Sequence, residues 1–246
     1  MSLSGKRVLI TGGGSGAGAD LALGFAGAGA AVVISGRRRE ALQAVAARSP
    51  AIRAVQGDVT VEADVRRMFA EAGPCDIVIA NAGAADSATI AKTTFDQWNA
   101  MIAVNLTSVF LTLRERLNQM AGWGRLISVA STAGLKGYAK VAPYAAAKHG
   151  VIGLTRSLAL EIARRPVTVN ALCPGFLDTP MTDHSIEVIA DKTGRTRAEA
   201  KAALEGMNPQ GRLIRPAEVT AAALWLCGPG SEGINGQAIT IAGGEL

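Results

Sequence analysis

Short apolar runs alternate with helical patterns along the 246 residues, and this alternation is the feature that most restricts the fold. Strands that alternate with helices indicate an α/β protein whose parallel sheet is covered on both faces. The predicted strands are Arg7–Thr11, Ala31–Ser35, Ile52–Gln56, Asp76–Ala80, Arg125–Ala130, Val167–Leu172 and Gln237–Ile241. The predicted helices are Gly16–Ala28, Arg38–Arg48, Val61–Glu71, Thr94–Met120, Tyr144–Arg164 and Pro216–Cys227. Because crossovers between parallel strands are right-handed, we expect a doubly wound, Rossmann-type sheet in the order 3-2-1-4-5-6-7.

The segment Phe176–Arg212 interrupts this alternation between the sixth strand and the last helix. Thr196 and Glu199 have the spacing of a capping box, which predicts a helix inside the segment. A long excursion from the carboxyl edge of a parallel sheet is a typical position for a substrate lid, and a surface helical hairpin is the alternative. No polar low-complexity run or Pro/Ser-rich linker divides the chain, so we expect a single domain over residues 1–246.

Composition limits the class of protein. Apolar residues form 49% of the chain and charged residues 18%, which is enough apolar material for a large core. The net charge is +5, but the basic residues are scattered and aromatics are few, so nucleic-acid binding is not expected as the main function. The apolar stretches are too short, and too often interrupted by glycine, to span a bilayer.

The three cysteines, Cys75, Cys173 and Cys227, match neither a metal-binding spacing nor a disulfide framework. The first strand begins by about Lys6, which leaves no room for a signal peptide. These features predict a cytoplasmic protein without a metal site.

The sequence Thr11-Gly-Gly-Gly-Ser-Gly-Ala-Gly18 lies directly between the first predicted strand and the first predicted helix. Glycines at such a turn allow positive φ and let a pyrophosphate approach the backbone N–H groups at the helix N-terminus. The turn therefore predicts a dinucleotide site that includes Gly12, Ser15, Gly16 and Ala17.

The second predicted strand is followed by Gly36 and then by three consecutive arginines that begin at Arg37. A site for NAD usually has a carboxylate at this point, which binds the ribose 2′-hydroxyl. Arginines at a helix N-terminus oppose the helix dipole, and an anion bound nearby would offset this cost. We therefore expect NADP(H) in preference to NAD(H), with Arg37 binding the 2′-phosphate and Ser35 as a further donor. A solvated basic start of the helix is the alternative.

Two further segments follow strands at the same edge of the predicted sheet. Asp58 and Val59 follow the third strand, where the Asp58 carboxylate could accept a hydrogen bond from the adenine amino group. Asn81, Ala82 and Gly83 follow the fourth strand and would flank the adenosine. Each segment alone is an ordinary turn, and the positions after successive strands are what indicate a shared site.

Four residues are candidates for catalysis. Tyr144 and Lys148 are four apart in a predicted helix, so their side chains share one face. An ammonium beside a phenol favours the phenolate, which is expected to lower the pKa of Tyr144 toward a value useful for proton transfer. Ser131 ends the fifth strand, where its hydroxyl could hold a substrate oxygen near Tyr144. Asn105 lies in an otherwise apolar helix, and a buried amide there needs partners, for which a water chain to Lys148 would serve.

These motifs resemble those of the short-chain dehydrogenase/reductase family over essentially the full chain. The matching positions are Thr11-Gly-x-x-x-Gly-x-Gly18, Asn81-Ala-Gly83, Asn105, Ser131, Tyr144-x-x-x-Lys148 and Pro174-Gly175. The resemblance implies a Ser-Tyr-Lys-Asn tetrad, hydride transfer to a carbonyl, and a homodimer or homotetramer formed through the two long helices. It also implies that the nicotinamide amide is held by residues after the sixth strand, namely Pro174, Gly175, Phe176 and Thr179. The chain departs from the family pattern at Ser15, where NADP-dependent members often carry a basic residue, and at Ala80, where a second Asn is commonest.

The branch of the family that reduces 3-ketoacyl thioesters, including polyketide ketoreductases, is resembled by Ala142–His149, Val169–Met181, Asn208–Arg212 and Gly236–Gly244. The expected substrate is therefore a 3-oxoacyl thioester of coenzyme A or an acyl carrier. Arg164 and Arg165 could contact the phosphates of such a carrier, although cations also suit a helix C-terminus. Two alternatives stay open: an NAD-linked dehydrogenase of a small hydroxy acid, sugar or cyclic alcohol, and a non-catalytic dinucleotide-binding regulator.

Overall fold

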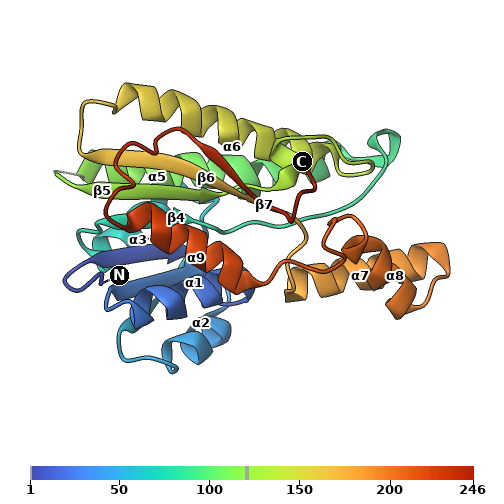
Figure 1. Ribbon diagram of the computed structural model, residues 1–246, viewed down its shortest axis with the longest axis horizontal. Helices are drawn as coiled ribbons and strands as arrows, with labels where there is room; N and C mark the ends of the chain where they lie inside the picture. Colours follow the sequence, from blue (N-terminus) through green and yellow to red (C-terminus); the bar gives the residue numbers. More distant parts are fainter. Residues whose placement is uncertain (1, 120–121) are drawn as a thin grey trace.

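The computed structural model describes residues 2–119 and 122–246, which form a parallel sheet in the order β3-β2-β1-β4-β5-β6-β7 (Figure 1). Its strands are β1 (Arg7–Thr11), β2 (Ala31–Gly36), β3 (Ile52–Gln56), β4 (Ile77–Ala80), β5 (Gly124–Val129), β6 (Val167–Pro174) and β7 (Ala238–Ile241). The register is continuous across the sheet, with Leu9 opposite Val33 in β2 and Val78 in β4. The predicted fold class and strand order are confirmed.

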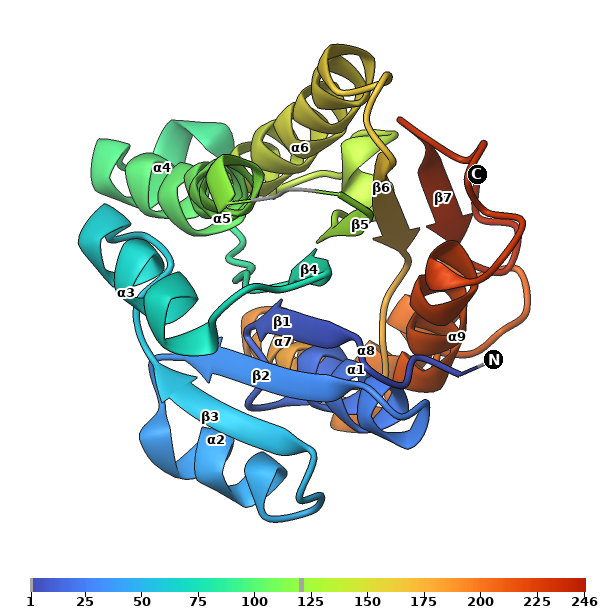
Figure 2. The same cartoon turned by 90° about the vertical axis from the view of Figure 1, so that its left-hand side faces the viewer.

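Helices cover both faces of the sheet. They are α1 (Gly16–Gly27), α2 (Arg39–Ala46), α3 (Glu62–Ala72), α4 (Phe95–Ile102), α5 (Ser108–Gln119), α6 (Ala142–Glu161) and α9 (Pro216–Cys227). α3, α5 and α6 lie on one face, and α1, α2 and α9 lie on the other (Figure 2). In the described part of the chain, no helix is both long enough and apolar enough to cross a membrane.

The helix predicted over Thr94–Met120 is divided in the structure. Five residues of π-helix, Ala103–Thr107, separate α4 from α5, and the predicted last residue, Met120, lies outside the described residues. The start of the predicted helix is confirmed, because Thr94 and Gln97 form a complete capping box that fixes where α4 begins.

Side chains of β1 alternate between two apolar cores. Leu9 packs with Phe69 of α3 in the core on one face, whereas Val8 and Ile10 pack with Phe25 of α1 on the other. Full burial of such side chains contributes about 1.5–3 kcal/mol each. Because both faces are filled by these cores, a ligand can reach the sheet only at the ends of the strands.

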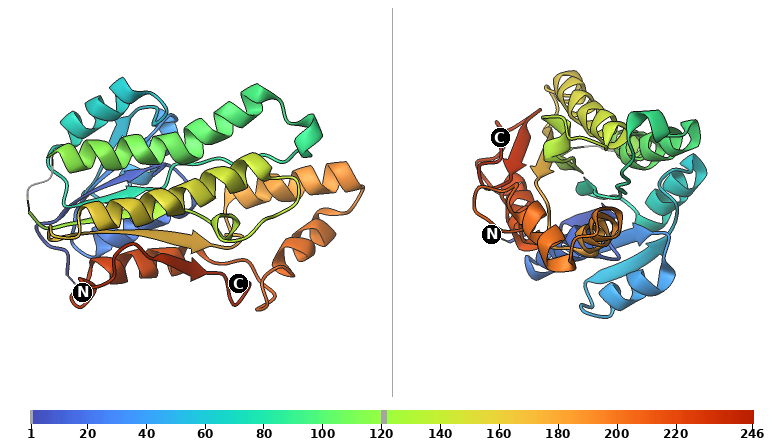
Figure 3. Two further views of the ribbon diagram at one scale, coloured as in Figure 1. Left: turned by 90° about the horizontal axis from the view of Figure 1, so that it is seen from above. Right: turned by 90° about the vertical axis from the view of Figure 1, so that its right-hand side faces the viewer.

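The predicted insertion 176–212 forms the helices α7 (Pro180–Thr193) and α8 (Arg197–Glu205), which project beyond one end of the sheet (Figures 1 and 3). The predicted capping box is present, with Thr196 and Glu199 each accepting a hydrogen bond from the other's backbone N–H group. A small separate core, Ile186, Ala200, Leu204 and Leu213, joins the two helices. The insertion is therefore a helical hairpin with its own packing.

Candidate active site

A cleft of about 690 Å³ lies at the carboxyl edge of the sheet, lined by the ends of β1, β2, β4, β5 and β6 and by residues of α7. This volume is within the usual range for small-molecule sites, and this edge is where open parallel sheets bind ligands. Every residue predicted from the sequence to belong to the site lines the cleft, with the exception of Ser35.

The glycine turn between β1 and α1 leaves no space for side chains at its main positions. Gly12 and Gly16 have φ values of 69° and 54°, in the left-handed region that favours glycine. A Cβ atom on Gly18 would lie 2.2 Å from the carbonyl oxygen of Gly12, and one on Gly12 would lie 2.8 Å from the Cα of Ala82. The turn brings the N-terminus of α1 to the cleft, and such helix N-termini bind phosphate groups.

Thr11 and Asn81 join the end of β4 to the glycine turn. Thr11 Oγ1 accepts hydrogen bonds from the backbone N–H groups of Asn81 and Ala82, at 3.0 and 3.1 Å. The Asn81 side-chain amide donates to the carbonyl oxygens of Thr11 and Gly12, at 2.9 and 3.3 Å. Asn81, predicted to flank an adenosine, therefore also fixes the turn, and Thr11 shares this role although sequence reasoning did not assign it one.

The end of β2 differs from the prediction in its details. Ser35 is fully buried inside the sheet and does not line the cleft, so it is not placed to donate to a ligand there. The cleft is lined instead by Arg37 and Arg38, and Arg38 Nη2 donates a hydrogen bond to Ser15 Oγ at 3.0 Å. Ser15 is the position at which the family often has a basic residue. Arg38 thus brings a guanidinium group from a neighbouring loop to the same place.

Asp58 follows β3 and lines the cleft together with Val59. Its Oδ1 accepts hydrogen bonds from the backbone N–H and the hydroxyl of Thr60, at 2.9 and 2.7 Å, so the carboxylate is held in one orientation. The contact of this carboxylate with an adenine amino group stays a prediction.

Asn105 lies in the middle of the π-helical segment that separates α4 from α5. Such segments occur frequently at functional sites. The amide is fully buried and forms two hydrogen bonds with the backbone of Ala84, at 2.9 and 3.3 Å. A Cβ atom on Gly83 would lie 2.8 Å from Asn105 Oδ1 and 3.7 Å from Lys148 Nζ, so these three residues are close together. The backbone of Ala84 therefore supplies hydrogen-bond partners for the buried Asn105 amide. The water chain to Lys148 stays a prediction.

Ser131, Tyr144 and Lys148 lie near one another, where the carboxyl end of β5 meets the N-terminal part of α6. Ser131 lies two residues after the end of β5 and accepts a hydrogen bond from the Ala133 N–H at 3.1 Å, which caps the short 3-10 helix Thr132–Gly134. Lys148 Nζ lies 5.6 Å from the centroid of the Tyr144 ring and donates to the Val129 carbonyl oxygen at 2.9 Å. Each of the three side chains lines the cleft.

The pKa values of this group differ from the sequence-based expectation. Burial raises the pKa of Tyr144, and a hydrogen bond with Ser131 acts in the opposite direction. Burial also lowers the pKa of Lys148 to about 8. The lowering of the Tyr144 pKa by Lys148 is therefore not found, because desolvation dominates both groups and the Lys148 amine is held by Val129. Tyr144 is a neutral phenol at pH 7, which is the form that donates a proton.

The chain leaves β6 at Pro174 and Gly175 and passes along the cleft to α7. The Gly175 N–H donates to the Ile241 carbonyl oxygen at 3.1 Å, which fixes this exit against β7. Thr179 is the N-cap residue of α7, and its methyl carbon would lie 3.3 Å from a Cβ atom on Gly16. The helical hairpin thus begins in contact with the glycine turn.

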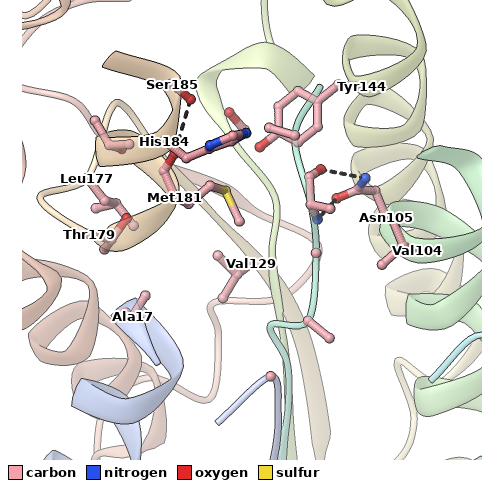
Figure 4. Close-up of a pocket in the computed structure, with 18 of the residues that line it drawn as sticks. Ala17, Val104, Asn105, Val129, Tyr144, Leu177, Thr179, Met181, His184 and Ser185 are labelled. Atoms are coloured by element: carbon pink, nitrogen blue, oxygen red, sulfur yellow. Dashed lines mark hydrogen bonds between the residues drawn. The ribbon is translucent and has the colours of Figure 1, made fainter. Parts of the chain in front are cut away.

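Several residues of the cleft were not identified from the sequence. Met181 and His184 extend from α7 into the cleft, and the His184 ring points toward Tyr144 (Figure 4). Tyr138 and Lys140 belong to the loop before α6, and Lys140 has a φ of 67°, which is uncommon for a residue other than glycine. For Met181 and His184 the signal in the sequence was the length of the insertion, which does not show which side chains face the cleft.

The two ends of the cleft together define a class of protein. One end has a glycine turn at a helix N-terminus with guanidinium groups beside it, and the other has a serine, a tyrosine and a lysine near one another. The glycine positions leave a space that side chains would fill, which fits the close approach of a pyrophosphate. This combination is that of a nicotinamide-dependent oxidoreductase.

The comparisons with known proteins agree with this class. Residues 6–189 match the family model described as short chain dehydrogenase, and the chain belongs to this family. The chain is 37% identical over 257 residues to D-beta-hydroxybutyrate dehydrogenase of Cupriavidus necator, covering 98% of each chain. It is 34% identical over 253 residues to sorbitol dehydrogenase of Cereibacter sphaeroides, covering 100% of this chain and 99% of the relative.

A solved structure shows the same similarity in three dimensions. The crystal structure of a variant of actinorhodin polyketide ketoreductase with NADPH superimposes with a TM-score of 0.92 at 32% identity, covering 100% of this chain and 99% of the other. The protein is therefore an oxidoreductase that acts on CH–OH or carbonyl groups.

Proposed function

We propose that this protein is an NADPH-dependent reductase of 3-oxoacyl thioesters. The observation that carries the proposal is the arrangement of groups along the cleft. A neutral Tyr144 phenol lies between the cofactor end, which has two arginines, and the substrate end, which has an apolar lining. The cleft therefore combines a proton donor, a place for a 2′-phosphate and a surface for an acyl chain.

In the proposed reduction, the hydroxyls of Ser131 and Tyr144 bind the carbonyl oxygen of the substrate. NADPH, when bound, supplies the hydride to the carbonyl carbon. The π electrons of the C=O bond move to the oxygen, and Tyr144 donates its proton there, so that an alcohol forms. Lys148, whose Nζ lies 5.6 Å from the centroid of the Tyr144 ring, passes a proton from solvent that replaces the one lost, and Asn105 holds the adjoining backbone at Ala84. In the oxidative direction Tyr144 accepts the proton.

The NADPH preference rests on Arg37 and Arg38. Charge-assisted hydrogen bonds contribute about 1.5–3 kcal/mol each, so Arg38→Ala is expected to raise the KM for NADPH roughly 10- to 100-fold. The KM for NADH should not change, because NADH lacks the 2′-phosphate. Arg39→Ala is the matched control, since Arg39 is outside the cleft lining. Steady-state kinetics with both cofactors test this. An unchanged NADPH preference in both Arg37→Ala and Arg38→Ala would contradict the assignment of a 2′-phosphate site to these arginines.

The substrate end favours an acyl chain because most of its lining is apolar. The lining includes Phe176, Met181, Val188, Leu204 and Met207. A polyol would leave most of its hydroxyls without partners on such a surface, and each unpaired polar group is costly. Rates measured over keto-thioesters, free keto acids and cyclic ketones test the proposal. The highest kcat/KM is expected for a 3-oxoacyl thioester, and a preference for free acids would contradict it.

A second candidate is an NAD-linked dehydrogenase of a small hydroxy acid. It is favoured by the two basic side chains in the wall of the cleft, Lys140 and His184, which could bind a carboxylate. The full-length similarity to a D-beta-hydroxybutyrate dehydrogenase points the same way. Oxidation of free 3-hydroxy acids with NAD, at rates above those of thioester reduction with NADPH, would select this candidate.

Carrier binding and assembly form the last part of the proposal. Arg164 and Arg165 lie between the end of α6 and the start of β6, which is the edge of the sheet opposite the cleft. A carrier phosphate near the cleft of the same subunit is therefore beyond their reach. We also propose a homodimer or homotetramer, supported by the exposed apolar residues Phe110 on α5 and Leu160 on α6. Light scattering of the purified protein measures this state, and a monomer would contradict it.

A further inference from the structure

The segment that follows β7 returns to the cleft and places a carboxylate behind its wall. Glu245 has a side chain that is only 3% exposed, and it forms an ion pair with Lys136 at 3.1 Å. Its carboxylate also accepts a hydrogen bond from the Tyr138 hydroxyl. The backbone carbonyl of Glu245 accepts a further hydrogen bond from Lys136 Nζ at 3.2 Å. One residue is thus tied by three contacts to the loop between Ser131 and α6.

The direction of these hydrogen bonds follows from the groups involved. An ionised carboxylate can only accept, so the single proton of the Tyr138 hydroxyl goes to Glu245. The Tyr138 oxygen lies 2.7 Å from Thr132 Oγ1, which must therefore be the donor in that second bond. Thr132 directly follows Ser131, so the network runs from Glu245 through Tyr138 to the turn that carries the predicted catalytic serine.

The same carboxylate also packs against the exit from β6. A Cβ atom on Gly175 would lie 3.0 Å from Glu245 Oε2, so little space separates the two residues. Gly175 and Tyr138 both line the cleft, whereas Glu245 is outside its lining. Glu245 therefore lies between the predicted nicotinamide turn and one wall of the substrate end.

The Tyr138 hydroxyl is hydrogen-bonded to two groups, Glu245 and Thr132. Burial and the hydrogen bond to Glu245 raise the Tyr138 pKa, so the phenol stays neutral and keeps its proton between the two oxygens. Without the carboxylate the ring would lose the contact that fixes its orientation. The wall that it forms beside Tyr144 would then vary in position.

We propose that Glu245 is a positioning residue, which holds the Tyr138 ring as a fixed wall of the substrate end and so sets how the carbonyl is presented to Tyr144. This inference rests on the proposed function, because it concerns the substrate of that reaction. It assigns a role to a segment far from the motifs that define the family.

The kinetic test compares Glu245→Leu, which removes the acceptor, with Tyr138→Phe and the double variant, and Glu161→Leu is the control at an exposed position on α6. The substrate is a 3-oxobutanoyl thioester with NADPH. Loss of one hydrogen bond corresponds to a KM for the thioester roughly threefold to tenfold higher, with kcat and the KM for NADPH within about twofold. The ratio of product enantiomers should fall in both single variants. The KM of the double variant for the thioester should be no higher than the larger of the two single-variant KM values, because both changes break the same hydrogen-bond network.

A merely structural role predicts a different pattern, namely a lower melting temperature and a lower active fraction with unchanged KM and unchanged enantiomer ratio. That pattern, or effects of the two changes that simply add, would overturn the proposal.

A second measurement does not need turnover. The chain has two tyrosines, so labelling tyrosine with ¹³C at Cζ gives two NMR signals, and Tyr144→Phe identifies the one from Tyr138. Glu245→Leu should shift and broaden the Tyr138 signal, whereas Glu161→Leu should leave it unchanged. If the wild-type protein reduces no carbonyl compound, the proposed function fails while this measurement still decides whether Glu245 fixes Tyr138. A signal that is equally narrow and unshifted in Glu245→Leu would overturn the inference.

Discussion

The two ends of the cleft are built in different ways. At the cofactor end, the side chains of Thr11 and Asn81 fix a glycine turn by hydrogen bonds to the backbone. A Cβ atom on Gly18 would lie only 2.2 Å from the carbonyl oxygen of Gly12. At the substrate end, the walls come from segments that leave the sheet, namely the α7–α8 hairpin, the loop before α6 and the segment after β7.

The polar contacts that hold the hairpin at the substrate end lie on the exposed surface. Lys192 Nζ donates to the Ser87 carbonyl oxygen at 3.2 Å, across from the hairpin to the loop after β4. Arg197 of α8 pairs with Asp183 and Glu187 of α7 on the exposed surface, where ion pairs stabilise little. This difference indicates that a substrate preference can change while the cofactor end stays the same.

The first prediction concerns the residue at which the two ends meet. Tyr144→Phe removes the proton donor, and general acid catalysis contributes about 10²–10⁴-fold, so kcat should fall by that factor. The affinity for NADPH, measured by fluorescence titration, should be unchanged, because the cofactor end is intact. Tyr138→Phe is the matched control, in which kcat should be nearly normal. Carbonyl reduction at the wild-type rate in Tyr144→Phe would show that Tyr144 is not the proton donor and that the tetrad assignment is wrong.

A second prediction tests the rigidity of the cofactor end. Gly18→Ala would place a methyl group against the Gly12 carbonyl, and such overpacking costs about 1–3 kcal/mol of folding free energy. NADPH binding should be lost or greatly weakened. Gly27→Ala, in the same helix but with open space around the new methyl group, should instead stabilise the protein by up to about 1 kcal/mol. Urea unfolding and NADPH titration of both variants give the comparison, and equal behaviour would show that the turn is not tightly packed.

The third prediction concerns the substrate end alone. Leu204 belongs to the small core of the hairpin and also lines the cleft, so Leu204→Ala should loosen that wall. The KM for the carbonyl substrate should rise several-fold, with the KM for NADPH unchanged. Ile90→Ala truncates an apolar side chain at an exposed position outside the cleft lining and serves as the control. A parallel rise in both KM values would show that the two ends are not independent.

A smaller effect should appear in the pH dependence of stability. Because the Lys148 pKa is lowered from 10.5 to about 8, the unfolded chain binds more protons than the folded one between these values. This residue therefore destabilises the fold below about pH 8, and its contribution improves as the pH rises, by on the order of 1 kcal/mol per pH unit.

The measurement for this effect is the difference in unfolding free energy between wild type and Lys148→Met from pH 8 to pH 10, by urea unfolding. The buried thiols of Cys75 and Cys227 have raised pKa values and act in the opposite direction, but they are common to both proteins and cancel in the difference. The Cys173 thiol interacts electrostatically with Lys148, so the comparison is made with Cys173→Ala in both proteins. A difference that does not change with pH would contradict the assigned direction.

The cofactor end could be predicted from the sequence because its parts are consecutive. Strand, glycine turn and helix follow one another at residues 7–27, and the ends of parallel strands must meet at one edge. The sequence indicated Arg37 as the ligand of the 2′-phosphate and gave no sign of Arg38. The hydrogen bond that brings Arg38 to the glycine turn joins it to Ser15, which is far away in the sequence. Ser35 was assigned to the cleft because it ends a strand, but the alternation of side chains places it inside the sheet.

The substrate end could not be predicted in the same way. The capping box at Thr196 located a helix, but the packing of that helix against α7 depends on tertiary contacts. Apolar periodicity continued through Asn105, so it gave no sign of the π-helical break. The Tyr144 pKa was expected to be lowered because the spacing to Lys148 shows proximity and not burial. Glu245 belongs to no motif, and only the return of the chain after β7 brings it to Tyr138.

The central claim is that the Tyr144 hydroxyl meets the substrate carbonyl beside the nicotinamide. A crystal structure of the protein with NADPH and a non-reacting 3-oxoacyl thioester analogue tests it most directly. The account predicts that Tyr144 Oη and Ser131 Oγ both lie about 2.6–3.2 Å from the carbonyl oxygen, with the nicotinamide C4 facing the carbonyl carbon. A carbonyl bound elsewhere in the cleft, with the Tyr144 hydroxyl directed away from the nicotinamide, would contradict it.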